Sequence, residues 1–176
     1  MLNEPDNTDA LLQHLKWADA EVWKKVLALN APEKDERITK LLYHLHQVQY
    51  AFYFLWSGLP VEIAKPESFT NLNSIAKWGF DYQNKLDEFL QSNKADEKEK
   101  LIDIPWSKFL ERKTGKKVVT ATLRETMFQV ALHSTYHRGQ INTRLRELGG
   151  EPPSVDFIIW IWLNKPNADW SYLFQP

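Results

Sequence analysis

Two histidines in the C-terminal third of the chain, His133 and His137, have a spacing that suits metal binding. Residues four apart on an α-helix leave the same face one turn apart, with Cβ atoms roughly 5–6 Å from each other. Two imidazoles at that separation can bind one divalent ion, because both ring nitrogens reach a common centre. A pair is only part of a site, so a metal would need a further ligand from elsewhere in the chain.

A third ligand is available in the stretch LLYHLHQVQYAFYFLW, residues 41–56, which contains His44 and His46. Two residues on a helix span about 200° of rotation, so these two imidazoles point to nearly opposite sides and cannot share one metal. His44 falls within the apolar arc from Leu41 to Val48, which predicts that it points inward, whereas His46 groups with more polar neighbours. Taken alone, His44 is better interpreted as a buried neutral histidine. As a partner of the histidine pair it is the preferred third ligand, with His46 as the alternative.

Three imidazoles match the ligand count of a catalytic metal site, because three protein ligands leave a position open for water or substrate, whereas structural zinc sites close with four. Only neutral imidazole binds, so metal occupancy should fall below about pH 6. Imidazole suits several divalent ions; we favour zinc or nickel and keep iron and manganese open. The ion could generate hydroxide, polarise a carbonyl or hold a thiolate substrate. The reacting group would then be a water or a thiol at the open position, and the chain has no cysteine to compete for it.

Helices are needed to position these histidines, and four long amphipathic segments are predicted. Apolar residues recur at three- and four-residue steps over residues 8–29, 35–56, 70–91 and 122–148. The last segment begins with the Thr-x-x-Glu pattern of a capping box at Thr122 and stops at two glycines. The pattern predicts an all-α four-helix bundle with the histidine site in its core.

The connections between these helices differ in character. Residues 30–34 (NAPEK) should end the first helix, and residues 57–68, with two prolines and a glycine, indicate a loop. Residues 92–121 contain two short stretches rich in β-branched and aromatic residues, LIDIPWSKFL and GKKVVTA, which predict a small β-hairpin or an ordered crossover. After the fourth helix, the segment VDFIIWIWL predicts a short fifth helix, packed across the bundle or forming a dimer surface, because it is too short to span a membrane.

Length and composition limit the class of protein. The 176 residues favour one domain over residues 1–176, and 43% apolar residues supply ample material for a core. Lys and Arg number 22 against 23 Asp and Glu, a balance that argues against binding to nucleic acid or to an anionic membrane. The absence of cysteine fits a reducing compartment, and no signal peptide or membrane-spanning run is apparent. We therefore expect a soluble cytoplasmic protein.

Together, LLYHLHQVQYAFYFLW and HSTYHRGQINTRLRELGGEPPSVDF resemble the DinB superfamily of metal-dependent enzymes. The most specific part is H-x-x-x-H-R-G-Q followed by L-G-x-x-P-P-x-x-D. The resemblance implies an up-down-down-up four-helix bundle with a long crossover, a homodimer, and a metal triad at His44, His133 and His137. Characterised relatives, such as bacillithiol transferases and mycothiol-dependent maleylpyruvate isomerase, transfer small thiols or isomerise thiol adducts. The resemblance therefore implies a transferase that acts on a low-molecular-weight thiol and an electrophilic small molecule.

The remaining residues of the motif allow more than one role. Arg138 could pair with an acidic group or anchor an anionic substrate, and Gly139 is predicted to permit close helix packing. Asp156 could cap the fifth helix or orient a metal-bound histidine, with capping preferred. His14 has no partner at ligand spacing, so a structural role is expected for it. Three tyrosines are candidates for a pocket or, by default, for core packing: Tyr43, Tyr50 and Tyr136.

A non-enzymatic alternative is a helical dimer whose histidines serve stability or partner binding. The aromatic segment from Phe157 to Trp162 motivates this hypothesis, because an exposed apolar patch of that kind would need a partner. A nuclease or DNA-binding role is disfavoured by the balanced charge.

Overall fold

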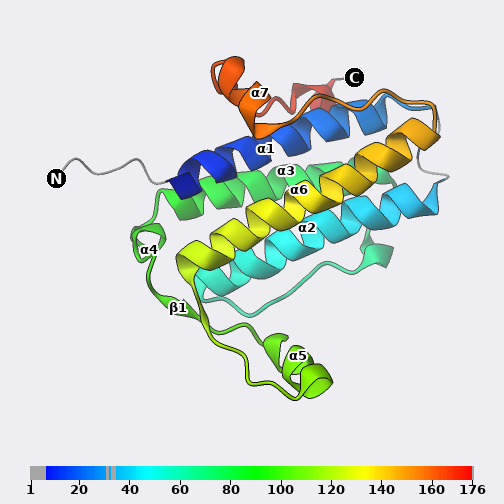
Figure 1. The fold of residues 1–176 in the computed structure, drawn as a ribbon. Helices are drawn as coiled ribbons and strands as arrows, with labels where there is room; N and C mark the ends of the chain where they lie inside the picture. Colours follow the sequence, from blue (N-terminus) through cyan, green and yellow to red (C-terminus); the bar gives the residue numbers. More distant parts are fainter. Residues whose placement is uncertain (1–6, 31, 33–34, 176) are drawn as a thin grey trace.

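Four long helices form the body of the structure, a computed structural model that describes residues 7–30, 32 and 35–175 (Figure 1). They are α1 (Asn7–Leu27), α2 (Glu36–Ser57), α3 (Leu72–Leu90) and α6 (Leu123–Glu147). Both α2 and α1 pack against α6 and also against α3, so the helices surround one core in the order α1, α6, α2, α3. In Figure 1, α1 and α6 run in one direction and α2 and α3 in the other. This confirms the predicted all-α bundle with up-down-down-up topology.

Side chains cap the starts of three of the long helices. The side chain of Asp35 accepts a hydrogen bond from the backbone of Ile38 at the start of α2. Asn71 forms a capping box at the start of α3, and Thr122 forms the expected capping box with Glu125 at the start of α6. These caps satisfy backbone N–H groups that have no partner within the helix. Of the predicted break over residues 30–34, residues 31, 33 and 34 lie outside the described part of the chain.

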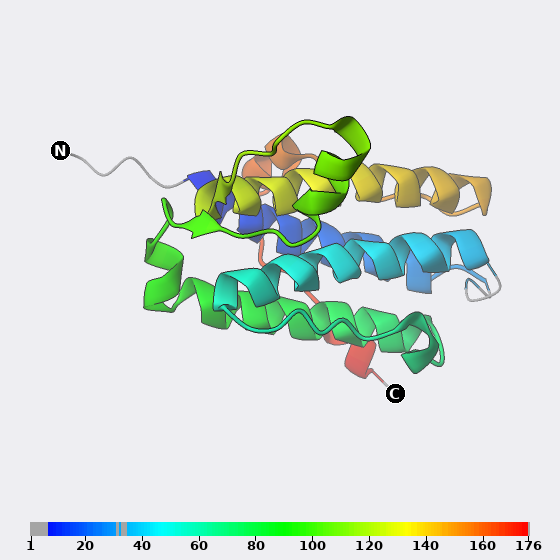
Figure 2. The same cartoon turned by 90° about the horizontal axis from the view of Figure 1, so that it is seen from below.

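Two connections shape the outside of the bundle. Because α2 and α3 are parallel, residues 58–71, which include the short η2 (Pro66–Ser68), travel back along the length of the bundle (Figure 2). The connection from α3 to α6 contains α4 (Asn93–Asp96), β1 (Leu101–Ile102), α5 (Ser107–Thr114) and β2 (Ala121–Thr122). The strands pair antiparallel, as predicted, with Leu101 opposite Thr122. The helix α5 was not predicted; its sequence SKFLERKT is rich in good helix formers, and Gly115 ends it in a left-handed conformation.

The C-terminal segment packs on the bundle, as expected for a fifth helix. In α7 (Phe157–Trp162), Trp160 is buried against Trp17 and Ala18 of α1. Beyond it, Trp170 and Leu173, the latter within η3 (Ser171–Phe174), join the main core. None of the helices in the described residues combines the length and the apolar character that crossing a bilayer requires.

A glycine lets α2 and α3 approach each other closely. A Cβ atom placed on Gly79 of α3 would lie 2.3 Å from Nε2 of His46, which is fully buried on α2. Only hydrogen at this position leaves room for the imidazole. Gly139 on α6 is different, because it is exposed and a Cβ there would meet nothing within 4 Å. The prediction that Gly139 permits close helix packing was therefore wrong, since none of the described residues packs against it.

We predict opposite effects of the same substitution at these two glycines. Gly79→Ala should lower the free energy of unfolding by about 1–3 kcal/mol, because the new methyl group overpacks the core against His46. Gly139→Ala should raise it by about 0.5–1 kcal/mol, because an exposed helix position gains helix propensity. Urea unfolding of both variants tests this. Equal effects, or a destabilised Gly139→Ala protein, would contradict the packing described for Gly79.

Candidate metal centre

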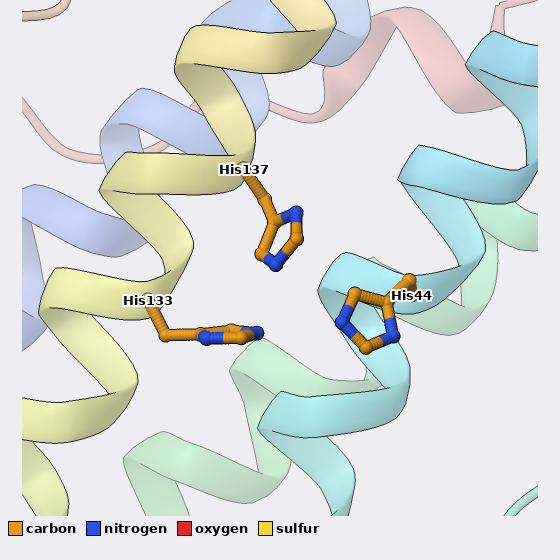
Figure 3. A group of neighbouring side chains, drawn as sticks. All are labelled: His44, His133 and His137. Atoms are coloured by element: carbon orange, nitrogen blue, oxygen red, sulfur yellow. The ribbon is translucent and has the colours of Figure 1, made fainter.

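The three predicted metal ligands lie together between α2 and α6 (Figure 3). One nitrogen from each of His44, His133 and His137 lies within 4.8 Å of the corresponding nitrogens of the other two. The ring centroids are 4.3 Å apart for His133 and His137, 4.7 Å for His44 and His137, and 5.5 Å for His44 and His133. Since zinc–imidazole bonds are about 2.0–2.1 Å long, small ring rotations would bring all three nitrogens onto one ion.

Two of these rings have nitrogens that lack a hydrogen-bond partner. His133 Nε2 and His137 Nδ1 are buried and unpartnered among the residues that the structure describes. Leaving a buried polar atom unsatisfied costs about 1–3 kcal/mol, so such atoms are rare unless a ligand completes them. Nitrogen lone pairs are good donors to divalent transition metals. The arrangement therefore fits a divalent ion.

His44 is oriented by a glutamine one helical turn away. Its Nδ1 lies 3.1 Å from Oε1 of Gln47, an oxygen that only accepts, so Nδ1 carries the hydrogen and Nε2 keeps its lone pair. Such a partner fixes the tautomer of a metal-binding histidine. A glutamine also follows three residues after His137, at Gln140. The His-x-x-Gln spacing is the signal in the sequence that indicates Gln47 as the residue supporting His44.

The surroundings keep the α6 histidines neutral. Burial, together with the nearby rings of His137 and His44, lowers the pKa of His133 to about 4. Burial and His44 also lower the pKa of His137, and Gln140 partly opposes this shift. Both rings are therefore uncharged at neutral pH, which is the form that binds a metal.

His46, the alternative third ligand, is used elsewhere. The indole Nε1–H of Trp23 donates to His46 Nε2 at 2.7 Å, and His46 Nδ1 donates to Gln49 Oε1 at 2.7 Å. Both ring nitrogens are thus occupied inside the core. The prediction that His44 points inward and His46 toward the polar side was wrong: His46 is fully buried and His44 only partly. The reason is Gly79 of α3, which makes room for one imidazole on the inner side of α2.

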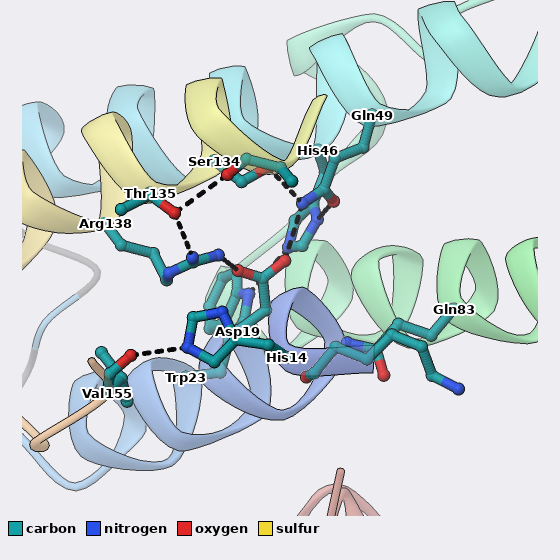
Figure 4. Close-up of polar contacts among 12 residues, drawn as sticks. His14, Asp19, Trp23, His46, Gln49, Gln83, Ser134, Thr135, Arg138 and Val155 are labelled. Atoms are coloured by element: carbon teal, nitrogen blue, oxygen red, sulfur yellow. Dashed lines mark hydrogen bonds and ion pairs between the residues drawn. The ribbon is translucent and has the colours of Figure 1, made fainter. Parts of the chain in front are cut away.

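A buried polar network lies next to the histidine cluster (Figure 4). Arg138 on α6 donates to Asp19 on α1 at 2.7 Å, and the two side chains are 3% and 0% exposed. The other carboxylate oxygen of Asp19 accepts from Gln49 on α2 at 2.7 Å, and Gln49 also lies 3.1 Å from the hydroxyl of Ser134. Of the two roles considered for Arg138, the structure shows the ion pair. The network links three helices at the point where α6 carries His133 and His137.

His14 and Asp156, two further residues considered from the sequence, lie outside the histidine cluster. His14 Nε2 lies 2.8 Å from the carbonyl oxygen of Val155, which agrees with the structural role expected for it. Asp156 occupies the N-cap position of α7, but its exposed side chain makes no capping hydrogen bond. It therefore shows neither the capping interaction nor a contact that would orient a histidine.

The three candidate tyrosines separate into two groups. Tyr43 and Tyr50 stack on Trp78, and their hydroxyls donate to Ala64 and Asp81 respectively, so both belong to the packing between α2 and α3. Tyr136 is 64% exposed, and its ring lies edge-on to His137 with centroids 5.1 Å apart. Of the three, only Tyr136 borders the histidine cluster.

An all-α bundle with a cluster of three histidines defines a class of helical proteins suited to binding a divalent metal. A model of the DinB family matches residues 1–168, and the chain belongs to that family. It is also similar to the uncharacterized protein YizA of Bacillus subtilis (strain 168). The two are 25% identical over 123 residues, which cover 70% of this chain and 72% of YizA.

We predict that Arg138→Met is strongly destabilising. It leaves the carboxylate of Asp19 buried without its counter-charge, which should cost about 3–5 kcal/mol of unfolding free energy. Arg37→Met is the matched control, because Arg37 pairs with Glu147 at the surface, and it should cost at most about 1 kcal/mol. Adding Asp19→Asn to Arg138→Met should recover part of the loss by removing the buried charge. Urea unfolding of the four proteins measures these differences, and equal losses for the two arginine variants would contradict the importance of the buried pair.

We also predict that the metal-free protein loses stability as the pH falls from about 6.5 to about 4. His133 has a pKa of about 4 in the folded protein, below the ordinary value of 6.5 expected after unfolding. Between these values the unfolded chain binds more protons than the folded chain, so acidification favours unfolding. His133→Asn should make the decline shallower. Unfolding free energies measured across this pH range in the presence of chelator test the prediction, which fails if both proteins show the same slope.

Proposed function

We propose that this protein is a divalent-metal-dependent enzyme that joins a low-molecular-weight thiol to an electrophilic small molecule. The observation that carries the proposal is the cluster of His44, His133 and His137, with two buried ring nitrogens that lack a partner. Three ligands of this kind leave a coordination position for a reactant, unlike a closed structural site. Membership of the DinB family and its resemblance to thiol-using relatives support the choice of substrate class.

In this proposal each residue of the site has a separate role. An ion held by His44, His133 and His137 would supply a Lewis-acidic position that favours the deprotonated form of a thiol at neutral pH. Gln47 holds the tautomer of His44, and burial keeps His133 uncharged. The Asp19–Arg138 pair restrains α6. In the overall reaction the S–H bond of the thiol breaks and its sulfur bonds to the electrophilic carbon. With an activated alkene the C=C π bond breaks and the neighbouring carbon takes up a proton; with a nitroaryl halide the carbon–halogen bond breaks, and halide and a proton are released to solvent.

The identity of the metal, the oligomeric state and the cellular location are further parts of this proposal. We favour zinc or nickel over iron or manganese, and we propose that the protein acts as a homodimer in the cytoplasm. A second candidate function is a non-enzymatic dimer in which the histidines serve stability. The specific observation in its favour is an exposed apolar surface formed by Ile158 and Trp162 of α7 and by Leu163, which follows the helix.

We predict that untagged protein purified without chelator contains about one divalent ion per chain, because the three histidines form one site. His133→Asn should lose most of this metal and remain folded, since the side chain is only partly buried. His14→Asn is the matched control and should keep its metal, because His14 lies outside the cluster. Elemental analysis and circular dichroism measure the two properties.

The proposal is overturned if the wild-type protein holds no metal under these conditions. Metal-loaded protein is then screened with small thiols against electrophiles such as activated alkenes and nitroaryl halides. Thiol consumption that His133→Asn lacks supports the enzyme, whereas full metal occupancy without turnover of any pair favours the structural alternative.

A further inference from the structure

We propose that a groove ending at His133 binds the apolar part of the electrophilic substrate, and that Trp106 forms its outer wall. This assignment of a substrate class rests on the proposed function. The groove has a volume of about 360 Å³ and is lined by residues of α2, of the crossover after α2 and of α6, together with Trp106 just before α5. Its position beside one of the three clustered histidines places its contents next to the site where the reaction would occur.

The lining of the groove selects for uncharged groups. Six of its nine lining residues are apolar: Val48, Ala51, Phe52, Val61, Ile63 and Trp106. The others are His133 and two glutamines, so none of the described residues that line it is an acid, a lysine or an arginine. Burying an unpaired charge against such a surface is costly, whereas an apolar group gains from it. The occupant is therefore a neutral aromatic or short aliphatic group.

The volume sets the size of that group. A cavity of about 150 Å³ is sufficient for benzene, and small-molecule sites begin at roughly 300 Å³. At about 360 Å³, the groove accommodates one substituted ring or a short branched chain. It is too small for a long acyl chain lying fully inside.

Trp106 and α5 lie at the surface of the bundle. None of the described residues of α5 is buried, and Phe109 and Leu110 on this helix are 63% and 50% exposed. Figure 2 shows α5 lying outside the face formed by α2 and α6. Trp106, immediately before α5, packs edge-on to Phe52 with ring centroids 5.4 Å apart and remains 43% exposed. The indole thus closes the groove on one side and leaves part of its surface for a ligand.

The two glutamines supply polar contacts close to the histidines. Gln47 uses its oxygen to accept from His44, so its NH₂ group can donate to a ligand. Gln129 lies one helical turn before His133 and has no hydrogen-bond partner among the described residues. Both amides can bind a carbonyl or nitro oxygen. The substrate class is therefore a neutral, apolar electrophile with an acceptor oxygen next to its reactive carbon, such as an unsaturated carbonyl compound or a nitroaryl.

Binding of two matched, unreactive probes tests this proposal on the full-length protein. 4-Nitrotoluene and 4-nitrobenzoate have similar size and share the nitro group, but only the second carries a charge. We expect 4-nitrotoluene to shift the indole NMR signal of Trp106, assigned with Trp106→Phe, and to bind at least about tenfold more tightly than 4-nitrobenzoate. Trp106→Ala, which removes the wall, and Ala51→Leu, which fills the groove, should each weaken binding about tenfold.

Trp162→Ala is the matched control, because Trp162 is 74% exposed on α7 and does not line the groove. It should bind 4-nitrotoluene as the wild type does. The proposal is overturned if the Trp106 signal does not move, if the anionic probe binds as tightly as the neutral one, or if both groove variants bind like the wild type.

Titrating metal-free and metal-loaded protein in parallel separates this proposal from the proposed function. If wild-type protein purified without chelator holds no metal and still binds 4-nitrotoluene, the groove stands and the metal-dependent enzyme is refuted. A protein with full metal occupancy that does not bind 4-nitrotoluene would refute the groove and leave the metal site standing.

Discussion

The buried ion pair between Asp19 and Arg138 is the interaction on which the rest of the structure depends. Two charges in a protein interior are tolerated only when they are paired and when their remaining hydrogen-bonding positions are filled. Here Gln49 fills the second oxygen of Asp19, and the hydroxyl of Thr135 accepts from the guanidinium of Arg138. The pair therefore specifies how α1, α2 and α6 are rotated about their axes, since most other rotations would leave a charge buried alone. Its main contribution is to make this arrangement unique, because apolar packing could supply comparable stability.

The same network explains why the histidine cluster is ordered. Ser134 and Arg138 each follow a clustered histidine directly in the sequence, so the contacts that orient them also orient His133 and His137 on the adjacent face of α6. On α2, Gln49 and His46 face the core while Gln47 and His44 face the seam with α6. On α2 the inner His46 is bonded at both ring nitrogens, whereas at the seam with α6 the nitrogens His133 Nε2 and His137 Nδ1 remain available. The residues that stabilise the core are therefore neighbours in the sequence of the residues that could bind a ligand, and the two sets do not overlap.

The outer elements determine what can reach the cluster. The parallel arrangement of α2 and α3 requires a crossover along the bundle, and this crossover supplies Val61 and Ile63 to the groove beside His133. The connection from α3 to α6 supplies Trp106. Both segments also pack on the core, through Ile63 and Ile102, but the side chains bonded to Asp19 and Arg138 come from the long helices alone. Residues in such segments can change without disturbing the Asp19–Arg138 network, which is why a bundle of this kind can hold one metal-binding arrangement and present it to different substrates.

The sequence by itself determined the four long helices of this protein. Their helical periodicity, the capping box at Thr122 and the four-residue spacing of His133 and His137 depend on local geometry, so they could be predicted with little error. Tertiary structure decided what depends on contacts between distant residues. It turned His46 inward and left His44 at the seam, because Gly79, 33 positions further along the chain than His46, makes room for one imidazole. It also selected Asp19 as the partner of Arg138 and placed Trp106 over the groove. The periodicity of one helix shows which of its sides is apolar, but it does not show which residues of another helix will contact that side. Those contacts are determined only when the helices pack.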